Sequence, residues 1–178
     1  MQKLHPVEWK RCIRCTLEVF LSETKNELVY LQDVQVSLGF DCLKNVEPIG
    51  NSSGLALLYS RDYLVKFIHV CNSLIDIETI IDENRVFITF VYGDLIVQYC
   101  ELVWERLTRI GIVRSESWFT IGDFNEIIGN HEKRGEKRRS GSYFLPFQCM
   151  IENCGMIDFP SIGSLFSLVG KQSCGAAG

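Results

Sequence analysis

Apolar residues fall into short runs along the chain, and the spacing inside each run predicts a strand or a helix. Residues 16–21 are mostly apolar and β-rich, which predicts a strand that delivers Glu23 at its end. Apolar positions then recur at helical spacing from residue 28 to residue 38, and Gly39 follows where a helix-ending glycine is expected. The first predicted unit is therefore a strand, an acid and a helix.

The middle of the chain predicts four strands. The runs 55–59 and 64–70 have the pattern of antiparallel neighbours joined by a tight turn. In residues 74–80, apolar and acidic positions alternate, which is typical of a strand with one wet face. Residues 86–92 are almost all apolar, so we expect a central strand buried on both faces and ending at a tyrosine.

The last third predicts two helices around one more strand. A helical stripe covers residues 100–110, and Gly111 is expected to end it before a strand that runs to Asp123. A second helical stripe covers residues 144–154 and is expected to end at Gly155, and residues 156–159 form a candidate short strand. Alternating strands and helices predict an α/β (mixed α+β) domain.

Composition limits the possible classes of protein. The chain has 178 residues, of which 47% are hydrophobic and 22% charged, as expected for one globular domain. A formal charge of −4 gives no overall basic field, so contact with nucleic acid would need a local patch. No signal peptide and no apolar run of roughly 20 residues is found. We expect a soluble intracellular protein without a membrane partner, in the nucleus or the cytoplasm.

The eight cysteines are scattered through apolar patterns, so we expect most of them to be buried free thiols. Cys12 and Cys15 form a C-x-x-C pair, which can bind zinc or take part in redox chemistry. No second pair lies at a finger-like distance, so this reading is the weaker one.

Four polar residues stand at the ends of predicted strands: Glu23, Tyr92, Asp123 and Asn125. Residues two apart in a strand share a face, so Asp123 and Asn125 are expected to point the same way. Two carboxylates and an amide are hard oxygen ligands that suit Mg²⁺ or Mn²⁺. A phenol can donate to a phosphoryl oxygen, and the acid with the amide can orient a water, which favours phosphodiester hydrolysis. The alternatives are a surface acid, a packing tyrosine and a polar turn.

A basic run follows this set, with Lys133, Arg134, Lys137, Arg138 and Arg139 inside the nine residues 131–139. Such a run can bind several phosphates if it lies beside the site. The alternative is a solvated loop of mixed charge.

Four short motifs occur in a specific order: FLSETK at residues 20–25, SGLAL at 53–57, VYG at 91–93 and GDFNE at 122–126. The series resembles the endonuclease/exonuclease/phosphatase (DNase I-like) domain. More narrowly, it is similar to the apurinic-type endonuclease domain of plant non-LTR (LINE-type) retrotransposons. The resemblance covers residues 16–169, which leaves 1–15 as a non-matching segment and 170–178 as a tail.

This resemblance implies a four-layer αββα sandwich of two mixed β-sheets and a magnesium-dependent endonuclease acting on DNA. Glu23 would bind the catalytic Mg²⁺ (or Mn²⁺), and Tyr92 would contact the scissile phosphate. Asp123 would activate or orient the water or assist the leaving group, and Asn125 would hold that geometry.

The chain departs from the family pattern at both ends. It has no W-N-x-R-G segment with a metal-site asparagine, and none of its three histidines lies in an S-D-H context. When several groups act as one catalytic unit, removing one of them can cost as much activity as removing several. We therefore expect an incomplete sandwich, truncated at both ends and inactive. The alternatives are a phosphatase of the same superfamily and a dead fragment that binds nucleic acid or protein through residues 133–139.

Overall fold

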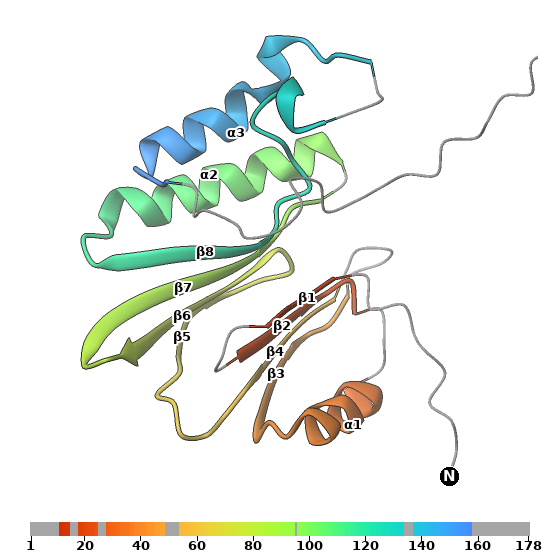
Figure 1. Cartoon of the computed structure of the whole chain (residues 1–178), viewed down its shortest axis with the longest axis vertical. Coiled ribbons are helices and arrows are strands. Elements are labelled where there is room, and N and C mark those ends of the chain that lie inside the picture. Colours follow the sequence, from red (N-terminus) through yellow and green to blue (C-terminus); the bar gives the residue numbers. More distant parts are fainter. Residues whose placement is uncertain are drawn as a thin grey trace, which may run out of the picture.

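The computed structural model of the chain describes residues 11–14, 18–24, 28–48, 54–94, 96–133 and 137–157. Within these residues two β-sheets pack face to face, with one helix outside the first sheet and two helices outside the second. Figure 1 shows these four layers, with the two helices at the top and the single helix at the bottom. The predicted α/β sandwich is confirmed.

The first sheet has the strand order β1-β2-β4-β3, and every described pair in it is antiparallel. Helix α1 covers its outer face through a cluster shared with two of the strands. The bounds are β1 (Arg11–Arg14), β2 (Glu18–Ser22), α1 (Leu28–Leu38), β3 (Cys42–Val46) and β4 (Leu55–Tyr59).

The second sheet has the order β5-β6-β7-β8. The bounds are β5 (Lys66–Val70), β6 (Leu74–Ile81), β7 (Asn84–Tyr92), α2 (Val97–Val113) and β8 (Ser117–Asp123). Because α2 crosses over between the last two strands, β8 runs parallel to β7. Among the described strands this sheet alone is mixed, whereas two mixed sheets were predicted.

Helix α2 packs with α3 (Gly141–Asn153) on the outer face of the second sheet, and η1 (Asn130–Glu132) is a short 3-10 turn before α3. The buried side chains of this layer are Leu74, Val91, Cys100, Val103, Trp104, Leu107, Phe147 and Met150. The helices thus bury one face of β6 and β7, and the first sheet buries the other.

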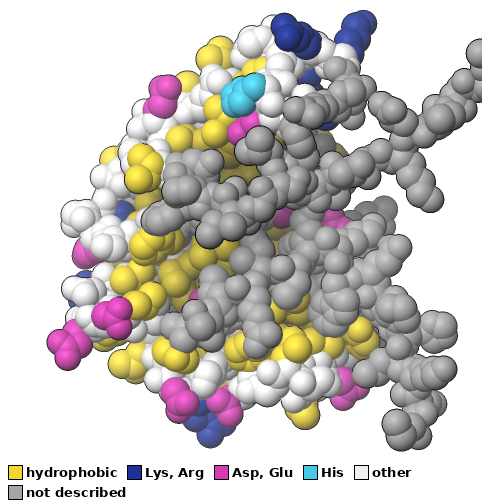
Figure 2. All heavy atoms as spheres, in the orientation of Figure 1, with side chains coloured by type: hydrophobic (Ala, Val, Ile, Leu, Met, Phe, Trp, Pro, Cys, Tyr) yellow, Lys and Arg dark blue, Asp and Glu magenta, His cyan; other side chains and the backbone are white. Residues whose placement is uncertain are grey.

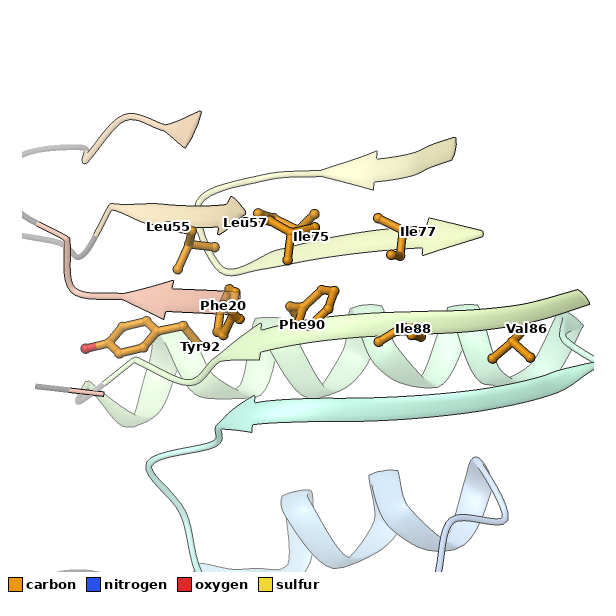
Figure 3. Close-up of a cluster of buried hydrophobic side chains, with 9 residues drawn as sticks. All are labelled: Phe20, Leu55, Leu57, Ile75, Ile77, Val86, Ile88, Phe90 and Tyr92. Atoms are coloured by element: carbon orange, nitrogen blue, oxygen red, sulfur yellow. The ribbon is translucent and has the colours of Figure 1, made fainter. Parts of the chain in front are cut away.

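Strict alternation of side chains lets single strands serve two layers. On β2, Phe20 points between the sheets, whereas Val19 and Leu21 point toward α1. The rings of Phe20 and Phe90 stack with centroids 5.3 Å apart, and Figure 3 shows them at the centre of the core between the sheets. The full set in that core is Phe20, Leu55, Leu57, Ile75, Ile77, Val86, Ile88, Phe90 and Tyr92.

The predicted pairing of residues 55–59 with 64–70 is wrong. Strand β4 lies between β2 and β3, while β5 pairs with β6 in the other sheet. The segment between them therefore crosses from one sheet to the other. Strands β1 and β3 were not predicted, because their sequences, RCIR and CLKNV, mix polar and apolar residues without a clear period.

The expected wet face of residues 74–80 is also wrong at Asp76, which is fully buried. Its carboxylate accepts hydrogen bonds from Arg114 at 2.8 and 3.0 Å and from the Thr89 hydroxyl at 2.6 Å. The Arg114 guanidinium lies 4.0 Å from the ring centroid of Phe87. The acidic position reflects a buried ion pair under the helices rather than contact with solvent.

Of the three glycines predicted to end helices, two do so. Gly39 and Gly155 follow α1 and α3 with φ of 77° and 61°, as expected for helix-ending glycines. Gly111, in contrast, lies inside α2, which continues to Val113.

The five cysteines whose side chains the structure describes are free, as predicted, but of these only Cys100 is buried; Cys42, Cys71 and Cys154 are half-buried and Cys149 is exposed. Cys15 of the C-x-x-C pair lies outside the described residues. Of the candidate strand 156–159, residues 156 and 157 are not in a strand, and residues 158 and 159 lie outside the described residues.

Glu18 opens β2 and is only 4% exposed. Because it lies two residues before Phe20, its side chain is on the face toward the second sheet. Burial raises the pKa of the Glu18 carboxyl from 4.5 to about 7. The folded chain therefore favours the neutral acid.

We expect the free energy of unfolding to fall by about 3 kcal/mol between pH 4.5 and 7, because the folded chain holds a proton that the unfolded chain has released. Above pH 7 this contribution is constant. Urea denaturation of Glu18→Gln across this range should lack the fall, while Glu101→Gln on the exposed side of α2 should keep it. An unchanged fall in Glu18→Gln would contradict the assignment.

Candidate functional site

The first two candidate residues meet where the two sheets are packed. Strands β2 and β7 point the same way in Figure 3, so their carboxyl ends lie at the same edge of the sandwich. There the Tyr92 hydroxyl donates a hydrogen bond of 2.9 Å to Oε1 of Glu23. This bond joins residues of different sheets.

Glu23 is held by the loop that follows β2. Its φ is 54°, and the next residue, Thr24, donates its backbone N–H to the carbonyl of Gly54 at 3.1 Å. A Cβ on Gly54 would overlap the Thr24 hydroxyl, so this close approach requires glycine. The glycine of the SGLAL motif thus helps to place the acid.

Asp123 is the last residue of β8 and stands opposite Tyr92 in the parallel register. Its carbonyl accepts the Gly93 N–H at 2.7 Å, and its side chain is 9% exposed. The Asp123 carboxylate therefore lies on the strand next to Tyr92.

Asn125 was predicted to share a strand face with Asp123, and this is wrong because β8 ends at Asp123. The chain then leaves the extended conformation, and Asn125 has a φ of 50°. Its backbone N–H donates to Oδ1 of Asp123 at 3.2 Å, and its side-chain amide donates to the Gly93 carbonyl at 2.6 Å. A Cβ on Gly93 would overlap the carbonyl of Phe124. The amide joins the loops that follow β7 and β8.

Two of the four candidate residues are in the left-handed backbone region. Among the described residues, the non-glycine residues with positive φ are Glu23, Asp82, Glu83 and Asn125. Asp82 and Glu83 form the hairpin turn between β6 and β7, where such values are common. Glu23 and Asn125 have no hairpin to explain theirs, and strained residues concentrate at functional sites.

Glu126 was not singled out from the sequence, although it ends the GDFNE motif. Its side chain is 7% exposed and lies 3.5 Å from the Arg139 guanidinium. Burial, and then the Glu126 carboxylate, raise the pKa of the Cys100 thiol to about 11. The residue after Asn125 is therefore a largely buried acid that pairs with Arg139.

The predicted basic residues have different surroundings. Lys137 and Arg138 are exposed, Lys133 and Arg139 are partly buried, and Arg134 lies outside the described residues. The Asn130 side chain accepts the Arg139 N–H at 2.9 Å and donates to the Arg139 carbonyl at 3.0 Å. These bonds close the loop and fix where its basic end lies.

The donor set suits a hard cation. Within the described ranges, no group of three or more His, Cys, Asp or Glu side chains is placed to hold an ion. Mg²⁺ does not need such a group, since it commonly uses one or two carboxylates together with waters and substrate phosphate. Glu23 and Asp123 fit that use. Both described histidines, His69 in β5 and His131 in η1, are exposed.

Comparison of the chain with protein-family models gave no match, and a search of curated proteins gave none either. No helix in the described part of the chain is long and apolar enough to cross a bilayer.

Replacing Tyr92 with phenylalanine should lower the free energy of unfolding by about 1.5–3 kcal/mol, because Glu23 loses a hydrogen bond to its carboxylate. Urea denaturation at pH 7 measures the change. Tyr99→Phe, on the exposed side of α2, is the matched control and should change stability little. Equal effects of the two substitutions would show that the bond does not stabilise the fold.

Proposed function

We propose that the chain is an endonuclease/exonuclease/phosphatase-type domain derived from a LINE-type retrotransposon endonuclease. Its site binds Mg²⁺ (or Mn²⁺) and a DNA phosphodiester, and a polypeptide of these 178 residues alone does not complete hydrolysis. The observation that carries this proposal is the 2.9 Å hydrogen bond from Tyr92 to Glu23, beside Asp123 on the adjacent strand. The order of the four motifs supports the ancestry.

Glu23 is the metal ligand in this proposal, and Asp123 lies on β8, the strand next to the one that carries Tyr92. A bound cation would polarise the phosphoryl group and neutralise its charge. Tyr92 has one hydroxyl proton, which it donates to Glu23 in the present arrangement. To contact a phosphoryl oxygen, the Tyr92 hydroxyl must donate that proton to the phosphate in place of Glu23. The Glu23 carboxylate would then be stabilised by the bound cation in place of this hydrogen bond.

Asp123 orients or deprotonates the attacking water in this proposal. Its carboxylate is fixed by the Asn125 N–H, and the Asn125 amide holds the loop after Tyr92 at the Gly93 carbonyl. Asn125 thus helps to fix the distance between Asp123 and Tyr92. Such positioning supplies a large part of catalysis when the reacting groups are all present.

None of the three histidines in these 178 residues lies in an S-D-H context, so we expect a polypeptide of these residues alone to lack turnover. General acid–base catalysis contributes roughly 10²- to 10⁴-fold to rate, and it fails when its proton carrier is absent. The two described histidines are exposed, on β5 and η1, and the series of motifs assigns neither to the site. Binding of cation and phosphate depends on other groups and is retained.

Mg²⁺ should stabilise the wild-type chain and leave Glu23→Gln unchanged. At about ten times the dissociation constant, binding adds about 1.4 kcal/mol to the free energy of unfolding and raises the melting temperature by about 3–5 °C. Glu101→Gln is the control for loss of one exposed acid. A folded wild-type chain that gains no stability from Mg²⁺ or Mn²⁺ would contradict the metal site.

Supercoiled plasmid should stay intact when it is incubated with the purified chain and Mg²⁺, because the proton carrier is missing. The assay is run beside Glu23→Gln and Asp123→Asn. Nicking that both substitutions abolish would overturn the proposed inactivity and would show that the site works without an S-D-H histidine.

A further inference from the structure

Arg139 has surroundings unlike those of the two basic residues before it. Lys137 and Arg138 are exposed, whereas the Arg139 side chain is 35% exposed and faces Glu126. Its guanidinium also lies 4.3 Å from the ring centroid of Tyr143, in the first turn of α3. The Glu126 carboxylate and the Tyr143 ring therefore hold the guanidinium at one place on the loop after β8.

The backbone of Arg139 is fixed as well. Asn130 binds both its N–H and its carbonyl, at 2.9 and 3.0 Å. Side chain and backbone together therefore place residue 139 against the loop that carries Asn125 and Glu126. Consecutive Cα atoms are about 3.8 Å apart, so Lys137 and Arg138 are held within about 8 Å of that fixed point.

We propose that Lys137 and Arg138 form the contact surface for a nucleic-acid backbone and that Arg139 is the positioning residue that holds them beside the site through Glu126. Arg139 itself does not contact phosphate. The inference rests on the proposed function and names the surface by which its substrate is held. Figure 2 shows basic side chains gathered at the end of the molecule that carries the loop before α3.

Two adjacent exposed cations, Lys137 and Arg138, suit a partner that presents successive phosphates, as a nucleic-acid backbone does. The chain has a formal charge of −4, so a general electrostatic attraction to polyanions is absent and binding needs a local contact. The Arg139–Glu126 ion pair and the Asn125–Gly93 hydrogen bond connect the basic pair to the loop that follows Tyr92. A nucleic-acid backbone held by the pair is therefore held at the loops after β7 and β8.

The test is the salt dependence of binding to a fluorescein-labelled 20-base-pair duplex, measured by anisotropy in EDTA. Each phosphate contact in duplex DNA contributes about 0.9 to the slope of log K against log salt. The double variant Lys137→Ser/Arg138→Ser should lower the slope by about 2. Arg139→Gln should keep the slope but weaken binding about three- to tenfold, because the loop loses its anchor. Lys66→Ser on β5 is the matched control and should change neither.

Glu126→Gln separates positioning from simple charge. Removing a negative charge near a polyanion should tighten binding if only the local field matters. In our proposal it weakens binding as Arg139→Gln does, because the anchor is lost from the other side. Arg139→Lys, which keeps the charge, should also keep the slope and serves if the glutamine variant does not fold.

A slope lowered by about 1 in Arg139→Gln would show a phosphate contact and overturn the proposal. Tighter binding by Glu126→Gln, or no binding by the wild-type chain at low salt, would overturn it as well. Because EDTA removes divalent cations, these outcomes are independent of the Mg²⁺-dependent stabilisation that tests the proposed function.

Discussion

The packing of Phe20 against Phe90 is the contact on which the site depends. Each ring projects from one face of its strand into the core between the sheets, while neighbouring residues on the other face serve a helix layer. Because β2 and β7 point the same way across this core, their carboxyl ends lie at one edge of the sandwich. A strand packed in the opposite direction would put Glu23 and Tyr92 at opposite ends.

The polar contacts at that edge follow from this geometry. The Tyr92–Glu23 bond joins the two sheets, and the Asn125–Gly93 bond joins the loops after β7 and β8. Left-handed backbone at Glu23 and Asn125 adds strain that the surrounding contacts must hold. A partly buried network of this kind favours one arrangement of its members, since partly satisfied alternatives are costly. Preorganised donors and acceptors are also what binding of a charged group requires.

The sequence predicts the parts of this fold that depend on local pattern. Helix α1 and its terminal glycine, the buried β7 and the placement of Glu23 at a strand end are all local features. Pairing is not local: β4 and β5 have similar apolar patterns but belong to different sheets. The burial of Asp76 depends on Arg114, 38 residues later, and the site bond spans 69 residues. Their positions at predicted strand ends and the order of the motifs grouped Glu23 with Tyr92, but neither specified the bond. The turn at Asn125 had no sequence signal beyond asparagine's tolerance of positive φ.

The central claim is that the strand ends carrying Glu23 and Asp123 form one cation site. Paramagnetic Mn²⁺, added at a small fraction of the protein concentration, broadens NMR amide signals near its binding site. We expect selective broadening at Thr24, Gly93 and Asp123, loss of this broadening in Glu23→Gln, and no effect at Ile80 near the far end of β6. Broadening that persists in Glu23→Gln, or that appears only elsewhere, would show that Glu23 and Asp123 do not form a cation site.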